Sequence, residues 1–153
     1  MNQNKFEEKN LNTAARVNTG LTDSPTLRYN ELLDDLGGNR EQTAELLEMF
    51  VQETIRRLGD AEGALGSQDM KCFHREIHSI KGGALNLMAD DLADYALRLE
   101  QPVKAGLSGG DGSGGVFPGI KTLRKDLEEL KKAFKRFTEV WNFIREKNEA
   151  DQE

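Results

Sequence analysis

Cysteine is almost absent from this sequence, and its scarcity excludes a large class of small proteins. Cys72 is the single cysteine among 153 residues, so the chain cannot form a framework of internal disulfides. Its stability must come from a packed core, and 37% hydrophobic beside 31% charged residues allow a modest core in about one domain. A reducing compartment is the setting that this cysteine content favours.

Long apolar runs and an excess of basic residues are missing as well. No stretch is long and apolar enough to span a bilayer, and residues 1–20 include acidic side chains without the apolar segment of a signal peptide. The formal charge is −6, which argues against nucleic acid and against an anionic membrane surface as partners. We therefore expect a cytoplasmic protein that binds neither.

Helical periodicity fills most of the chain, and no segment alternates as a half-buried strand would. The first predicted element is a short helix with Ser24 as N-cap and Pro25 in its first turn, ending at Gly37-Gly38. A long helix follows from Asn39 to about Gly66, and a third runs from about Asp69 to Leu87. A fourth helix is capped by Asp90 or Asp91, and the last covers about 120–147. Together they predict an all-α fold, an antiparallel four-helix bundle with an additional short N-terminal helix.

The helical bundle is expected to occupy residues 24–147. Residues 1–23 are interpreted as a flexible N-terminal tail and residues 148–153 as a C-terminal tail. Within the bundle, residues 105–119 hold seven glycines among fifteen positions and predict a flexible Gly-rich loop. This loop is a poor match to a phosphate-binding loop, because no strand precedes it and its lysine is displaced.

The last predicted helix has apolar residues at alternating steps of four and three, as in a coiled coil. They are Leu123, Leu127, Leu130, Phe134, Phe137, Trp141 and Ile144. We favour packing of this seam inside a monomer over dimerisation through it. A basic patch on the same helix, made of Lys131, Lys132, Lys135 and Arg136, is interpreted as a solvated face, with docking of an acidic partner as the alternative.

His78 is predicted to lie on the wet side of the third helix. At about 100° per residue, one narrow sector holds the apolar positions of this helix and must face the core. These positions are Phe73, Ile77, Ile80, Ala84 and Leu87. Lys81 and Gly82 follow His78 by three and four residues, so they share its side of the helix. An exposed nucleophilic imidazole beside an ammonium and a cleared surface suits transfer of a phosphoryl group between proteins.

The stretch "HSIKGG" at 78–83, with its helical setting, resembles the histidine phosphotransfer (HPt) domain of bacterial multistep phosphorelays. That family centres on His-x-Leu-Lys-Gly, and here Ile80 stands in for the leucine. The similarity extends over about residues 25–104, through "LLDDLGGNREQTAELLEMFVQETIRRL" and "ADDLADYALRLEQ". It implies a helical phosphocarrier without an ATP or metal site of its own, rather than an enzyme.

The resemblance assigns a role to each matching position. His78 matches the phosphorylated histidine, modified on Nε2, and Lys81 matches the lysine that steadies the phosphoryl oxygens. Gly82 matches the glycine that gives access, and Glu100 falls where the family often has Gln or Glu near the imidazole. The implied partners are receiver domains of response regulators and a sensor or hybrid histidine kinase. The only cofactor it implies, Mg²⁺, would sit in the partner's receiver domain.

Several alternatives stay open at this point. The family often has glycine where this chain has Met88, which makes the turn after the third helix uncertain. His74 is the rival phosphoryl acceptor, although Lys and Gly stand at the required offsets only from His78. Cys72 and His74 alone are a poor metal site. The competing function is a structural or adaptor bundle, in which His78 is incidental and the last helix makes the contacts.

Overall fold

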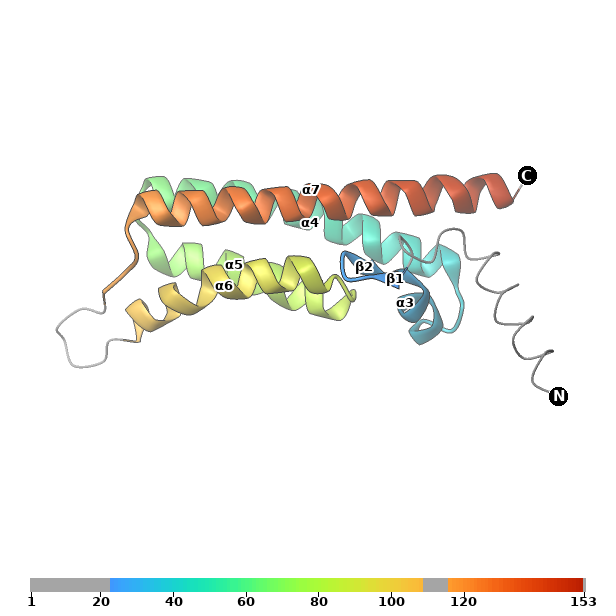
Figure 1. Ribbon diagram of the computed structural model, residues 1–153, viewed down its shortest axis with the longest axis horizontal. Coiled ribbons are helices and arrows are strands. Elements are labelled where there is room, and N and C mark those ends of the chain that lie inside the picture. The colour runs from blue at the N-terminus through green and yellow to red at the C-terminus, as the bar shows by residue number, and fades with distance from the viewer. Residues whose placement is uncertain (1–22, 109–115, 153) are drawn as a thin grey trace.

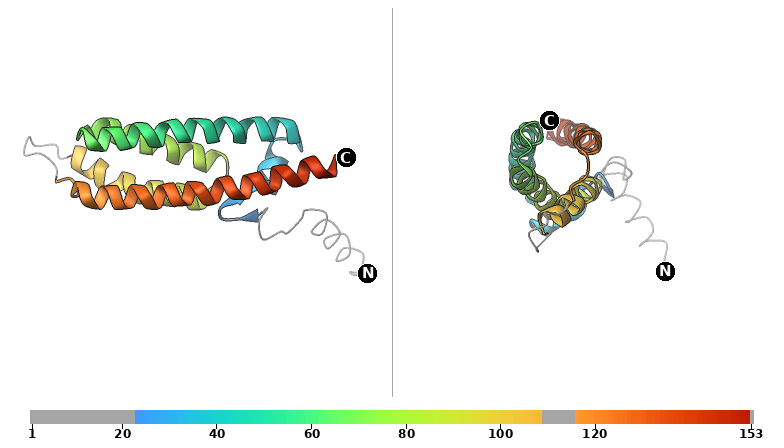
Figure 2. Two further views of the ribbon diagram at one scale, coloured as in Figure 1. Left: turned by 90° about the horizontal axis from the view of Figure 1, so that it is seen from above. Right: turned by 90° about the vertical axis from the view of Figure 1, so that its left-hand side faces the viewer.

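The computed structural model describes residues 23–108 and 116–152, and in them the chain forms a bundle of four long helices. The elements are β1 (Asp23–Ser24), β2 (Leu27–Arg28), α3 (Tyr29–Asp35), α4 (Arg40–Gly66), α5 (Met70–Asn86), α6 (Asp90–Leu107) and α7 (Ile120–Asp151). The helices α4, α5, α6 and α7 lie side by side along one axis, and neighbours run in opposite directions (Figures 1 and 2). Each packs on two others, α5 on α4 and α6, and α7 on α6 and α4. The predicted all-α four-helix bundle is confirmed.

The apolar seam of α7 lies in the core of this single chain. All seven seam residues named above are buried, so the heptad pattern is satisfied by α4 and α6 without a second copy. Trp141 is the largest fully buried side chain. Its Nε1–H donates to Oε1 of Glu48 on α4 at 3.0 Å, and its ring stacks on Tyr29 with centroids 6.1 Å apart. The long helices therefore share one continuous core.

Two of the predicted helix starts have side-chain caps. Asn39 caps α4 by accepting a hydrogen bond from the backbone N–H of Gln42, and Asp69 caps α5 by accepting from that of Cys72. Such caps replace the missing hydrogen-bond partners of a helix's first turn and are typically worth about 1 kcal/mol each. They fix where α5, the helix of His78, begins.

The predicted helix start at Ser24-Pro25 is wrong. These residues lie in and after β1, which pairs antiparallel with β2 in the register Asp23 to Arg28 and Ser24 to Leu27, and the helix begins only at Tyr29. Ser-Pro favours a turn as readily as a helix start. The prediction of no strand also fails here, although each strand has only two residues.

Contacts with the α5–α6 turn explain why the hairpin forms. The carbonyl of Pro25 accepts from the N–H of Asp91 at 2.9 Å, and the N–H of Arg28 donates to the carbonyl of Met88 at 3.1 Å. The guanidinium of Arg28 also donates to both carboxylate oxygens of Asp90, at 2.7 and 3.0 Å. These long-range bonds outweigh the local helical signal.

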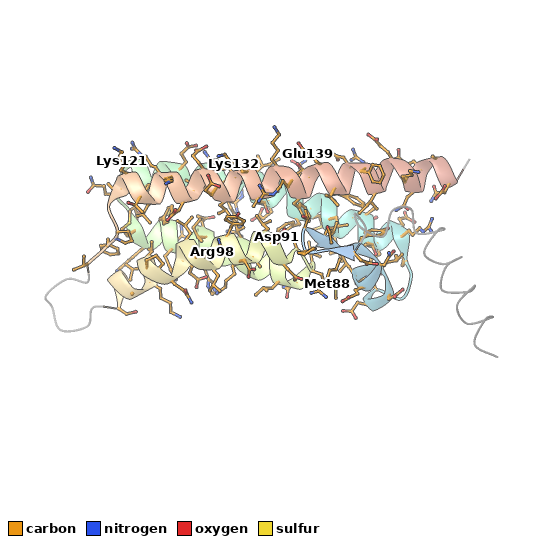
Figure 3. All side chains as sticks on the ribbon, in the orientation of Figure 1. Met88, Asp91, Arg98, Lys121, Lys132 and Glu139 are labelled. Atoms are coloured by element: carbon orange, nitrogen blue, oxygen red, sulfur yellow. The ribbon has the colours of Figure 1, made fainter. Side chains whose placement is uncertain are left out.

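The α5–α6 turn forms without the glycine that its shape favours. Met88, at this turn in Figure 3, has a φ of 60°, in the left-handed region that costs a non-glycine residue roughly 1–2 kcal/mol. Ala89 is the N-cap of α6, so the predicted cap at Asp90 or Asp91 is wrong. Both aspartates lie in the first turn, where their charge favours the helix N-terminus.

The predicted boundaries of the Gly-rich loop and of the C-terminal tail also need correction. Helix α6 continues through Pro102 to Leu107, and Phe117 packs so closely on Gly106 that a Cβ there would meet its Cδ1 at 2.5 Å. The loop predicted over 105–119 therefore starts later, and residues 109–115 lie outside the described part. Helix α7 runs to Asp151, so most of the predicted tail 148–153 is helical. The predicted N-terminal tail lies outside the described residues up to position 22.

None of the helices in the described ranges combines the length and apolar character that crossing a membrane requires.

Candidate functional site

His78 projects from the outer side of α5, as the helical wheel predicts. Its side chain is 59% exposed, whereas the five apolar positions named for this helix are all buried. The ring is thus held by a helix whose other face is locked into the core. An imidazole in this position can be reached by a second protein.

Glu100 on α6 lies against the inner edge of the His78 ring. Its carboxylate is 3% exposed, and its Oε1 is 3.0 Å from Nδ1 of His78. An ionised carboxylate only accepts hydrogen bonds, so Nδ1 carries the proton of the neutral ring. Nε2, on the far side of the ring, then keeps its lone pair. The contact that the resemblance suggested between these two residues is present.

Lys81 shares the same carboxylate. Its Nζ is 2.7 Å from Oε2 of Glu100, and its side chain is 20% exposed. The ammonium lies on the same side of α5 as His78, one turn further on, but its direct partner is the carboxylate. One oxygen of Glu100 therefore faces the imidazole while the other faces the ammonium group of Lys81.

The surroundings of Glu100 favour its ionised form. Burial alone would raise the pKa of Glu100, but the hydrogen bond and positive charge of Lys81, and the hydrogen bond from His78, outweigh burial and lower this pKa below its ordinary value of 4.5. The carboxylate is therefore ionised at neutral pH and remains an acceptor for the ring.

This lowered pKa predicts the shape of the acid-unfolding curve. A carboxyl with a lower pKa in the folded state stabilises the protein fully above its ordinary value, and this stabilisation is lost as pH falls through the folded-state pKa. Relative to Glu100→Gln, the wild-type protein should lose free energy of unfolding as pH falls below 4.5. Urea unfolding of both proteins at several acidic pH values tests this. Parallel curves would contradict the lowered pKa.

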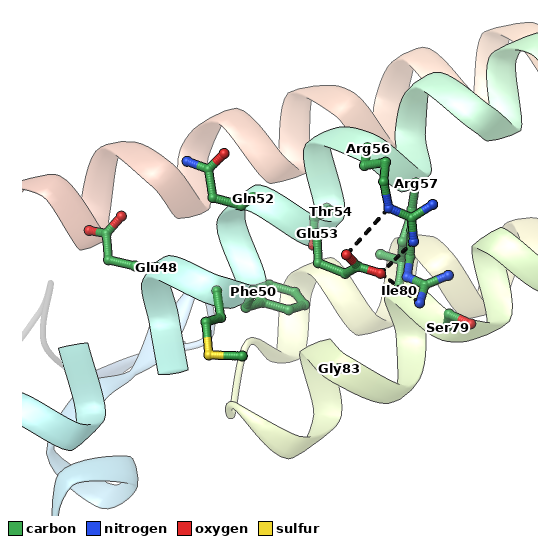
Figure 4. A pocket seen from close by; sticks show the side chains of 11 residues that line it. Glu48, Phe50, Gln52, Glu53, Thr54, Arg56, Arg57, Ser79, Ile80 and Gly83 are labelled. Atoms are coloured by element: carbon green, nitrogen blue, oxygen red, sulfur yellow. Dashed lines mark hydrogen bonds and ion pairs between the residues drawn. The ribbon is translucent and has the colours of Figure 1, made fainter. Parts of the chain in front are cut away.

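The two glycines after Lys81 have different environments. A Cβ at Gly82 would meet nothing within 4 Å, whereas one at Gly83 would lie 2.8 Å from Cε2 of Phe50. Figure 4 shows Phe50 of α4 and Gly83 of α5 on facing helices. Gly82 therefore leaves open space beside His78, while Gly83 allows α4 and α5 to approach closely.

Alanine substitutions should separate these two environments. Gly82→Ala should increase the free energy of unfolding by up to about 1 kcal/mol, because alanine favours the helix and its methyl enters open space. Gly83→Ala should decrease it by roughly 1–2 kcal/mol, because overpacking against Phe50 costs more than the helix gains. Urea unfolding measures both. Equal stabilisation by the two variants would mean that the Phe50 ring moves aside freely.

His74 lies one turn before His78 and forms a cluster with His78, Lys81 and Glu100. The two rings stack with centroids 5.8 Å apart and an interplanar angle of 19°. Nε2 of His74 is 3.8 Å from Oε1 of Glu100, and this nitrogen is shielded from solvent. A nitrogen that faces inward is badly placed to attack a partner's phosphoryl group, so the geometry favours His78 over its rival.

A groove of about 790 Å³ lies between α4 and α5, and Ser79, the residue after His78, is among those that line it. Its lining includes Met49, Phe50, Arg57, Ser79, Ile80 and Gly83. Met49 is 67% exposed, so an apolar side chain is presented to solvent here. Sequence reasoning did not identify these residues, since no spacing rule shows which side chains border a gap between helices.

Ion pairs form one rim of this groove. Arg56 and Arg57 both contact Glu53, as the dashed lines in Figure 4 show. Arg57 also reaches across to the buried Glu76 of α5 at 3.0 Å. The pairs within α4 follow the spacing of three and four residues that sequence reasoning can detect, whereas the pair with Glu76 depends on how α4 and α5 pack.

The basic patch of α7 is largely paired. Lys131 contacts Glu62 and Glu128, and Lys132 contacts Glu129, while Arg136 lies over the ring of Tyr95. These contacts favour the interpretation as a solvated face. Across residues 23–108 and 116–152, no group of three or more His, Cys, Asp or Glu side chains is placed to hold a metal ion.

Comparisons with known proteins agree with this geometry. The model of the Hpt domain family matches residues 45–133. This range is more than half of the chain and includes His74, His78, Lys81 and Glu100. The crystal structure of histidine-containing phosphotransfer protein B (HptB) from Pseudomonas aeruginosa PAO1 has a similar fold, with a TM-score of 0.62, 23% identity, and coverage of 83% of this chain and 97% of that one. No curated protein sequence matches significantly. The chain belongs to the Hpt domain family, the histidine phosphotransfer domains of phosphorelays.

Proposed function

We propose that this protein accepts a phosphoryl group on Nε2 of His78 from the aspartate of a receiver domain, or from a kinase, and passes it to another response regulator. The observation that supports this most directly is an exposed imidazole whose Nδ1 is held by the buried carboxylate of Glu100 at 3.0 Å. This arrangement leaves the outer nitrogen as the free nucleophile. The expected setting is the cytoplasm, where receiver domains and their kinases meet.

The transfer step needs no proton movement on this chain. The lone pair of Nε2 forms the N–P bond while the P–O bond to the partner's aspartate breaks, and that electron pair leaves with the aspartate carboxylate. The ring keeps its Nδ1 proton and gains a formal positive charge, which Glu100 offsets through its hydrogen bond. Lys81, 2.7 Å from the same carboxylate, adds positive charge beside the arriving phosphoryl oxygens, where a loose transition state concentrates negative charge.

The remaining catalytic groups would belong to the partner. A receiver domain would supply its acidic pocket and Mg²⁺, so this chain acts as a phosphocarrier and not as an enzyme. The α4–α5 groove, with exposed Met49 beside the arginines and Glu53, is the surface on which we expect the receiver domain to dock. An apolar centre with a charged rim is typical of such interfaces.

A transfer assay tests the proposal. The protein is incubated with each receiver domain of its source organism, charged with radiolabelled phosphate, and label on the chain is followed together with discharge of the receiver. We expect label that is labile in acid and stable in base, as a phosphohistidine requires. A structural adaptor would take no label from receivers that are known to transfer to other histidine phosphotransfer domains, and that result would overturn the proposal.

A further inference from the structure

Two imidazoles in this structure converge on one carboxylate oxygen. Oε1 of Glu100 is 3.0 Å from Nδ1 of His78 and 3.8 Å from Nε2 of His74. That Nε2 is a shielded polar atom without a hydrogen-bond partner in the structure. Protonation of His74 would therefore place a positive charge 3.8 Å from an oxygen with which the neutral ring forms no hydrogen bond.

Charged groups near His74 come from both α5 and α6, and Lys71 precedes it by three residues on the same side of α5. Glu100 faces it from α6, and His78 stacks on it from its own helix. Lys81 is held on the other oxygen of Glu100, and Lys104 follows Glu100 by one helical turn on the same side of α6. Among side chains of these types, imidazole is the one whose reference pKa lies near neutral pH.

Phosphorylation would change the balance of this cluster. With His78 neutral, the charges of Glu100 and Lys81 cancel. A phosphoryl group on Nε2 of His78 adds one net negative charge, even after the positive charge of the phosphorylated ring is counted. This charge lies beside His74, whose ring centroid is 5.8 Å from that of His78. A protonated His74 would offset this added negative charge. Linkage is reciprocal, so whatever favours the proton on phosphorylation also favours the phosphoryl group on protonation.

Resting on the proposed function, we propose that His74 is a positioning residue. Its protonation, on a ring stacked against His78 and with Nε2 3.8 Å from the same oxygen of Glu100, holds the phosphoryl group on His78. The transfer equilibrium with a receiver aspartate then depends on pH through this chain. At lower pH the phosphoryl group stays on the histidine, and at higher pH it moves to the receiver.

The test measures how labelled phosphoryl distributes at equilibrium between the full-length protein and one receiver domain. Wild type, His74→Gln and His74→Lys are compared with the same receiver between about pH 6 and pH 8. Relative to His74→Gln, the wild-type ratio of phosphohistidine to phosphoaspartate should rise roughly three- to tenfold as the pH falls toward about 6. This size is expected for unit charges near a protein surface on neighbouring rings whose centroids are 5.8 Å apart. His74→Lys should keep the ratio high throughout.

The variants separate charge from structure, because glutamine and lysine both remove the stacked ring while only lysine keeps a charge. Titration of the receiver domain is common to all three proteins and cancels in the comparison. Identical pH profiles for wild type and His74→Gln, or equal ratios for the Gln and Lys variants, would overturn the role of His74 and leave the proposed function standing. Absence of label on wild type would instead overturn the proposed function.

Discussion

His78→Gln should accept no phosphoryl group from any receiver that labels the wild-type protein. Glutamine can still contact Glu100, but its side chain offers no nitrogen lone pair to form the N–P bond. The fold should be retained, because the His78 side chain is 59% exposed and surface substitutions of this kind usually change stability by less than about 0.5 kcal/mol. Phosphotransfer with labelled receiver, together with circular dichroism and urea unfolding, measures both expectations.

His74→Gln is the matched control for this experiment. It replaces an imidazole by the same amide one turn earlier on α5, and it should still become labelled, with changes only in how the label distributes with pH. If His78→Gln keeps its label while His74→Gln loses it, His74 is the acceptor and the assignment of His78 is wrong. If both variants keep the label, the phosphoryl group lies elsewhere in the chain.

The sequence was sufficient to orient the helix that holds the site. Phe73, Ile77 and Ile80 repeat with the helical period and are buried, and this alone places His78 outward. The seam of α7 was equally predictable, because every one of its positions packs on the same core. Helical periodicity is local information, so a single chain reveals it without knowledge of neighbouring helices.

Contacts between helices could not be derived in the same way. That Glu100 meets His78 depends on the register of α6 against α5, which the resemblance suggested and which no spacing within one helix could fix. The hydrogen bonds of Arg28 and Pro25 to the α5–α6 turn convert a plausible helix start into a hairpin. Met88 shows the same limit, because tertiary contacts hold it in a conformation that its side chain disfavours.

In the proposed function, the site combines a nucleophile that faces solvent with a charge that does not. His78 has to be exposed to meet a partner, and exposure leaves its ring free to rotate. The contact of Nδ1 with Glu100 restricts this rotation. The carboxylate is only 3% exposed and is itself held by Lys81 at 2.7 Å. A docking partner would therefore meet a ring that is already oriented, and less ordering would remain to be paid for on binding.

Glu100→Gln should slow phosphoryl transfer to His78 by roughly 10- to 100-fold while leaving the bundle folded. The amide oxygen of glutamine can still accept from Nδ1–H, so the tautomer is preserved. What is lost is the negative charge that offsets the positive charge on the ring as the N–P bond forms. Hydrogen bonds to charged groups contribute about 1.5–3 kcal/mol, and each 1.36 kcal/mol of barrier is about tenfold in rate. A quenched time course of label transfer from a phosphorylated receiver domain, present at saturating concentration, measures this rate.

Glu128→Gln provides the control for the change in net charge. It removes one carboxylate from the outer face of α7, where Glu128 contacts Lys131, and should leave the rate of transfer near that of wild type. A uniform decrease in both variants would point to weaker long-range attraction between the proteins, which added salt would reproduce in wild type. A wild-type rate for Glu100→Gln would show that the carboxylate only orients the ring, and that the charge developing on His78 is offset by the partner.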